Sequence, residues 1–98
     1  MDYEIQQKES SGKGMFFIEE NGDIVGQLHY SLKDNGIMIL DHTEVDPKMS
    51  GKGLGSKLVR HSVDFAREKN YKVQPQCTYA AKQFERHGEY REVLLNQQ

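Results

Sequence analysis

The hydrophobic pattern of this chain changes its period once, and the change falls on a glycine-rich segment. Before residue 46, apolar and polar residues mostly alternate, which is typical of half-buried strands. After residue 53, apolar residues recur every three or four positions up to residue 66, which is typical of a helix with one buried face. The pattern therefore predicts an α+β (α/β) domain in which a mostly antiparallel, twisted sheet precedes one long helix.

Two short turns divide the first half of the chain into strands. Asn21-Gly22 is a strong hairpin signal because both residues tolerate the positive φ of a type I′ turn, and residues 34–36 (Asp-Asn-Gly) give a second turn. We expect strands over residues 14–20, 23–32 and 37–45, with a short edge strand over residues 3–8. Within residues 23–32 the alternation predicts one face with Ile24, Gly26, Leu28, Tyr30 and Leu32, and a second face with Val25, Gln27, His29 and Ser31.

The second half of the chain is predicted to hold two helices. The long helix is expected over residues 55–69, with Asn70 as its C-terminal stop. A short strand over residues 71–74 follows, then a short helix over residues 79–87 that ends at Gly88. Residues 90–94 are expected to form a last strand.

Length and composition limit the function classes. The 98 residues suffice for one domain, covering residues 1–98. No apolar run approaches the roughly 20 residues of a membrane span, and the charged first ten residues are unlike a signal peptide. Cys77 is the single cysteine, so no internal disulfide forms, and a cytoplasmic location is expected. The four histidines are scattered, so no metal site is predicted.

The glycine-rich segment carries the strongest functional signal. Gly51, Gly53 and Gly55 alternate where the long helix begins, and residues 48–72 hold seven Lys and Arg against two Asp and Glu. The first amides of a helix lack internal partners and favour a phosphate, which glycine allows to approach closely. The spacing fits neither a nucleotide P-loop nor a dinucleotide fingerprint. A flexible connection beside a solvated basic helix face remains the alternative.

The segment Ser50-Gly51-Lys52-Gly53-Leu54-Gly55 resembles motif A of the GCN5-related N-acetyltransferases, which reads Gln/Arg-x-x-Gly-x-Gly/Ala. Ser50 departs from the first position of that motif. The chain is most similar to a minimal subfamily of about 100 residues, which lacks the usual acceptor helices between the first two strands. Residues 75–80 and 87–90 extend the similarity.

The resemblance implies acetyl-CoA or coenzyme A as the bound molecule. It places the diphosphate on residues 50–56 and the pantetheine arm along residues 43–45, with Phe84 beside the arm. The implied cofactor-binding residues are Glu44, Val45, Ser50, Gly51, Lys52, Gly53, Leu54, Gly55, Ser56 and Phe84.

Three residues are candidates for the chemistry of acetyl transfer. In the wider family a tyrosine often sits four residues before the glycine that ends the last helix, and Phe84 occupies that position here. The subfamily instead resembles a cysteine-bearing site, in which Cys77 carries the acetyl group. His42 is a candidate base and Tyr79 a candidate proton donor to the leaving thiolate. Each also has a purely structural interpretation. Cys77 could be a small buried thiol, His42 could be held by hydrogen bonds within the sheet, and Tyr79 could only pack against its neighbours.

Three functions are compatible with these residues. The first is an N-acetyltransferase that takes its acetyl group from acetyl-CoA and passes it to an unidentified amine, either a small molecule or a protein side chain. The second is a non-catalytic acetyl-CoA-binding or sensing module. A nucleic-acid-binding domain that uses the basic helix is the least favoured, because the rest of the chain is acidic and no aromatic residues suited to base readout lie near the basic patch. No membrane partner is expected.

Overall fold

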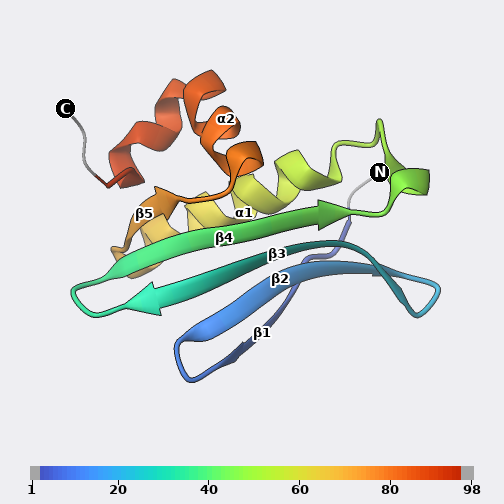
Figure 1. The fold of residues 1–98 in the computed structure, drawn as a ribbon, viewed down its shortest axis with the longest axis horizontal. Coiled ribbons are helices and arrows are strands. Elements are labelled where there is room, and N and C mark those ends of the chain that lie inside the picture. Colours follow the sequence, from blue (N-terminus) through green and yellow to red (C-terminus); the bar gives the residue numbers. More distant parts are fainter. Residues whose placement is uncertain (1–2, 96–98) are drawn as a thin grey trace.

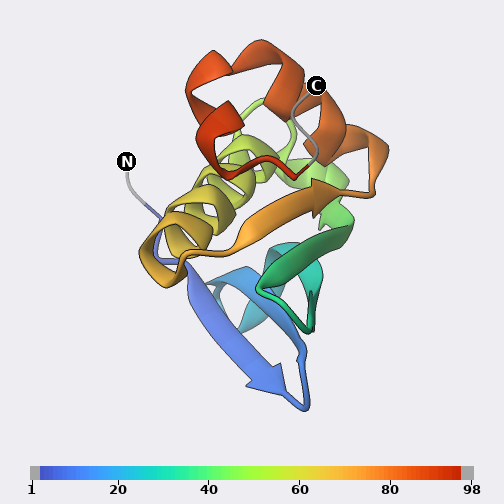
Figure 2. The ribbon, with the colours of Figure 1, turned by 90° about the vertical axis from the view of Figure 1, so that its left-hand side faces the viewer.

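A computed structural model of the chain describes residues 3–95, which form one five-stranded sheet with two α-helices packed on a single face (Figures 1 and 2). The strands lie in sequence order, β1 to β4 are antiparallel, and β5 runs parallel to β4. The elements are β1 (Gln6–Ser10), β2 (Lys13–Glu20), β3 (Asp23–Lys33), β4 (Ile37–Val45), the 3-10 helix η1 (Pro47–Met49), α1 (Leu54–Lys69), β5 (Lys72–Pro75), α2 (Thr78–Arg86) and the 3-10 helix η2 (Gly88–Val93). The predicted sheet-then-helix architecture is confirmed.

Local turn chemistry produces the meander. Both predicted turns are present, and Ser11-Gly12 forms another that joins β1 to β2. Each turn pairs a left-handed non-glycine residue with a left-handed glycine, which suits the twist of the flanking strands. The φ values are 54° and 78° at Ser11 and Gly12, 54° and 85° at Asn21 and Gly22, and 71° and 73° at Asn35 and Gly36. Asn70, at φ 61°, ends α1 as expected.

One predicted strand face is partly wrong. Val25 is 3% exposed and belongs to the core, whereas Ile24 is 40% exposed. The register between β2 and β3 shifts between Ile18 and Glu19, so Val25 is an extra residue on its strand. A bulge of this kind breaks strict alternation. From Gly26 onward the predicted alternation holds, since Leu28 and Tyr30 share the face that packs in the core.

The predicted last strand, residues 90–94, is wrong. That segment is mostly η2, and Leu94 alone makes an isolated bridge to Val73. Tyr90 and Val93 are buried, and the Tyr90 ring packs edge-on against Phe84 at 5.4 Å between centroids. Because residues i and i+3 eclipse in a 3-10 helix, this geometry points both side chains at the core. The predicted edge strand over residues 3–8 is displaced to Gln6–Ser10.

The helices cover one face of the sheet, and the described chain leaves the other face open (Figures 1 and 2). On the open face, His29 contacts Gln27 at 2.9 Å, and Gln27 donates to Glu44 at 3.4 Å. His42 lies 3.7 Å from Glu44. No helix within residues 3–95 is long and apolar enough to cross a bilayer.

The stability of the fold is expected to decline in acid because of His61. Its ring packs edge-on against Phe16 at 4.8 Å, and burial lowers its pKa while Asp64 partly opposes that shift. The unfolded chain, whose His pKa is 6.5, therefore binds this proton more readily than the folded chain. The free energy of unfolding should be fully present above about pH 6.5 and fall as the pH drops towards the folded pKa.

Urea unfolding at pH 7.5 and pH 5.5 measures this effect. His61→Gln should reduce the difference between the two pH values. His42→Gln, which removes an imidazole that is 60% exposed, should leave most of it. An equal pH dependence in the wild type and His61→Gln would contradict the assignment.

Candidate active site

The glycine loop between η1 and α1 presents a row of backbone amides. Gly51 and Gly53 have left-handed φ values of 84° and 73°, and Gly53 is the residue that caps α1. Within the described chain, no hydrogen bond engages the amides of Gly51, Gly53, Leu54, Gly55 and Ser56. No acidic side chain lies in the first turn of α1. The positive end of the helix dipole is therefore available to an anion.

Four of these five residues, all except Ser56, line a cavity of about 480 Å³. Its walls come from the end of β4, the glycine loop and the start of α2. The lining residues are Thr43, Val45, Asp46, Met49, Ser50, Gly51, Gly53, Leu54, Gly55 and Tyr79. Adding a Cβ at Gly51 or Gly53 would meet nothing within 4 Å, so ligand atoms can approach the backbone there.

The cavity continues along an open edge of β4. Pairing between β4 and β5 ends at Leu40 and Pro75, where the Leu40 carbonyl accepts from the amides of Gln76 and Cys77 at 3.0 and 3.1 Å. Beyond that point, residues 42–45 pair only with β3 in the described structure, and Asp41 is an extra residue at a β-bulge. The chain after β5 turns away into α2, so β4 and β5 form a wedge.

Cys77 lies at the closed end of this wedge. Its Sγ is 3.4 Å from Thr43 Oγ1, and Thr43 lines the cavity. The same Sγ accepts a hydrogen bond from the Ala80 amide at 3.4 Å and so caps α2. Cys77 therefore links the start of α2 to β4 through its sulfur.

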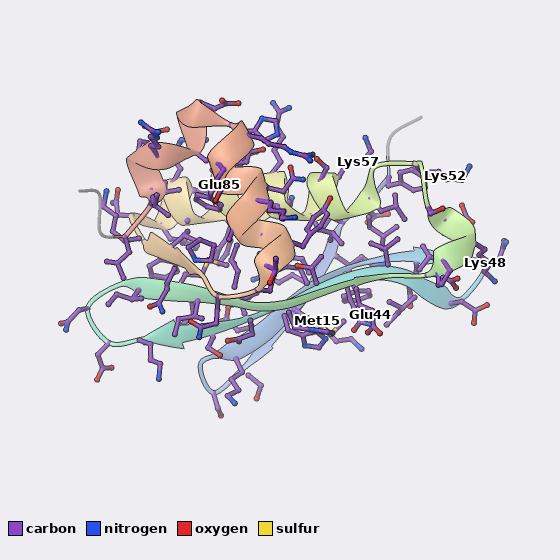
Figure 3. All side chains as sticks on the ribbon, turned by 45° about the horizontal axis from the view of Figure 1, so that its top comes forward. Met15, Glu44, Lys48, Lys52, Lys57 and Glu85 are labelled. Atoms are coloured by element: carbon purple, nitrogen blue, oxygen red, sulfur yellow. The ribbon has the colours of Figure 1, made fainter. Side chains whose placement is uncertain are left out.

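His42 and Glu44 lie on the other face of the sheet from the cavity. Thr43 and Val45 face the helices, whereas Glu44 faces the open side. Figure 3 shows Glu44 on the same side of the sheet as Met15, away from the helices. The structure thus brings Tyr79 into the cavity lining. Cys77 lies just outside the lining, against Thr43, and the His42 and Glu44 side chains lie behind β4. Only the Glu44 backbone is near the wedge.

Phe84 is also outside the cavity lining. It is 4% exposed and packs in the core against Tyr90. The Ser56 hydroxyl donates to Gln83 at 3.1 Å, so its amide is the donor that remains for a ligand. Lys48, Lys52 and Lys57 are exposed around the glycine loop (Figure 3). In the described chain, neither Lys52 nor Lys57 has an ion-pair partner.

Sequence reasoning missed Asp46, Met49 and Gln83. Asp46 has a recognisable signal, because an aspartate directly before proline is a typical helix start, and it caps η1 by accepting from the Lys48 amide. Met49 and Gln83 gain their positions from tertiary packing, for which the sequence holds no local signal. Among residues 3–95, no group of three or more His, Cys, Asp or Glu is placed to hold a metal ion.

Comparison with known proteins identifies the class to which this fold and cavity belong. A family model described as GCN5-related N-acetyl-transferase matches residues 15–93. A GCN5-like protein from Staphylococcus aureus, solved in solution, is 30% identical, covers 95% of this chain and 90% of its own, and superposes with a TM-score of 0.72. The chain belongs to the GCN5-related N-acetyltransferase family.

Larger acetyltransferases share part of the fold. Nourseothricin acetyltransferase is 26% identical over 63% of this chain and 38% of its own, with a TM-score of 0.55. The ribosomal-protein-S18-alanine N-acetyltransferase of Escherichia coli is 18% identical over 80% of this chain and 53% of its own, with a TM-score of 0.65, which supports the fold alone. A comparison with curated proteins finds no match.

Proposed function

We propose that this protein binds acetyl-CoA in the cavity and transfers the acetyl group to an amine. One observation carries the proposal: a row of unpaired helix amides and an unpaired strand edge open into the same cavity. The amides suit a diphosphate. The edge of β4 suits the two amide groups of a pantetheine arm, which can hydrogen-bond to it as an added strand does.

Cys77 is the proposed acyl carrier. Its thiolate attacks the carbonyl carbon of the thioester, a new S–C bond forms, and the S–C bond to coenzyme A breaks. The departing thiolate takes a proton from Tyr79. The acceptor nitrogen then attacks the acetyl group, the bond to Cys77 breaks, and the cysteine thiolate is restored.

His42 is the proposed base for the acceptor. Its imidazole lies on the open face of the sheet, so an amine approaching from that face meets it before reaching the edge of β4. His42 takes the proton that the amine releases and passes it to solvent, from which Tyr79 is reprotonated. Glu44, 3.7 Å from His42, supports the protonated imidazole.

A binding or sensing module is the second candidate. Phe84 supports it, because this side chain has no hydroxyl and is buried in the core, so it supplies no proton donor to the cavity. In that function acetyl-CoA would bind without turnover.

Calorimetry followed by an amine panel tests both candidates. We expect CoA and acetyl-CoA to bind with dissociation constants in the micromolar range, which corresponds to roughly −8 kcal/mol at 1 μM. Thiol release should then accelerate with at least one amine among polyamines, amino acids and lysine-containing peptides. Binding without thiol release favours the sensing module, and failure of both ligands to bind contradicts the proposal.

A further inference from the structure

Gly55 differs from the other two glycines of the loop. Its backbone is ordinary α-helix, so alanine would suit its conformation and would be favoured there by helix propensity. A Cβ added at Gly55 would nevertheless meet the Tyr79 ring, with Cζ and Oη both at 2.8 Å and Cε2 at 2.9 Å. The missing side chain thus admits an aromatic ring of α2, whereas Gly51 and Gly53 open onto empty space.

Tyr79 is a large aromatic side chain that is partly exposed to solvent and also packed against a neighbouring helix. It is 40% exposed, yet its ring rests against the first turn of α1 and lines the cavity. It lies two residues after Cys77, in the first turn of α2. The ring therefore contacts the start of α1, where the open amides lie, and belongs to the same helix that the Cys77 sulfur caps.

We propose that the Tyr79 ring, seated on Gly55, is the wall against which the pantetheine arm packs. This inference rests on the proposed function, since it assumes that the diphosphate occupies the helix amides. An arm running from those amides to Cys77 passes the ring and covers part of its exposed surface. Burial of an aromatic face against methylene groups stabilises the complex and directs the arm towards the sulfur.

This assignment separates the ring of Tyr79 from its hydroxyl. The ring contributes to affinity, so Tyr79→Phe should change the Kd for CoA by less than twofold. Tyr79→Ala removes the wall and should raise that Kd about tenfold or more. Because the proposed function assigns proton donation to the hydroxyl, Tyr79→Phe should lower turnover without altering the Kd for CoA.

A double-mutant cycle between Gly55 and Tyr79 is the decisive experiment. Gly55→Ala should raise the Kd for CoA about tenfold, because the new methyl group displaces the ring. In a Tyr79→Ala background the same substitution should change the Kd by less than twofold, because no ring remains to be displaced. ADP, which carries the diphosphate but no arm, should bind the wild type and Tyr79→Ala with the same Kd.

The outcomes separate this inference from the function on which it rests. Absence of CoA binding to the wild type would reject the proposed function itself. Normal wild-type binding with an unchanged Kd in Tyr79→Ala or in Gly55→Ala would overturn the inference alone. A Gly55→Ala effect that persists in the Tyr79→Ala background would also overturn it and assign Gly55 to the phosphate. Thermal unfolding of each variant establishes that it is folded, and Tyr79→Phe supplies an isosteric control.

Discussion

Replacing Gly53 by valine should raise the Kd for CoA by at least about 100-fold, equivalent to about 2.7 kcal/mol. Gly53 caps α1 and lines the cavity, and a side chain added there enters space that contains no protein atom within 4 Å. In the proposed complex that space belongs to the diphosphate, so the valine side chain would exclude it. Calorimetry with CoA measures the loss.

Backbone strain has to be separated from this effect. Gly53 has φ 73°, and a β-branched residue is strained in that region, so Gly53→Val should also lower the stability of the fold. Gly22→Val is a matched control: Gly22 has φ 85°, nothing lies within 4 Å of its added Cβ, and it sits in the turn between β2 and β3. We expect Gly22→Val to lose about as much thermal stability as Gly53→Val but to bind CoA with the wild-type Kd. Equal Kd values in the two variants would reject the loop as the diphosphate site.

Replacing Cys77 by serine should abolish a covalent acetyl adduct, about 42 Da in intact mass, that the wild type forms with acetyl-CoA. Turnover with an accepted amine should fall by at least about 100-fold, because a hydroxyl is a far weaker nucleophile than a thiolate. Cys77 also caps α2, and serine is among the preferred capping residues. The melting temperature and the Kd for CoA should therefore stay close to those of the wild type.

The alanine variant isolates the structural role of the same residue. Cys77→Ala loses both the thiol and the cap, and loss of a cap costs about 1 kcal/mol. We expect Cys77→Ala to melt earlier than Cys77→Ser while both lack the adduct. If Cys77→Ser retained wild-type turnover, Cys77 would be a capping residue with no part in the chemistry.

The features that the sequence predicts well are those that depend on neighbouring residues. The Asn21-Gly22 turn and the stop of α1 at Asn70 follow from backbone preferences of single residues. The bounds of β4, Ile37–Val45, follow from a nearly continuous apolar start and the proline at 47. The position of the glycine loop is predictable for the same reason, because the spacing of the glycines and the periodicity of the helix that follows are both properties of neighbouring residues.

The features that the sequence could not predict depend on contacts between distant segments. The bulge that turns Val25 inward arises from pairing with β2, and the burial of Phe84 arises from η2 packing onto α2. His42 and Glu44 were correctly placed on one strand face, but which face lies behind the cavity depends on where the helices dock. The contact of the Tyr79 ring with Gly55 is made between α2 and α1, and the sequence of neither helix contains a pattern that predicts it.

The order of strands in the sheet has a consequence for how this protein folds. Strands β1 to β4 pair only with their neighbours along the chain, through turns of two or three residues, so their contacts close short loops. The parallel pairing of β4 with β5 spans the whole of α1 and closes a much longer loop. Contacts of long sequence separation form late. The meander should therefore assemble first, and the segment that carries Cys77 should dock last, on a scaffold that already exists.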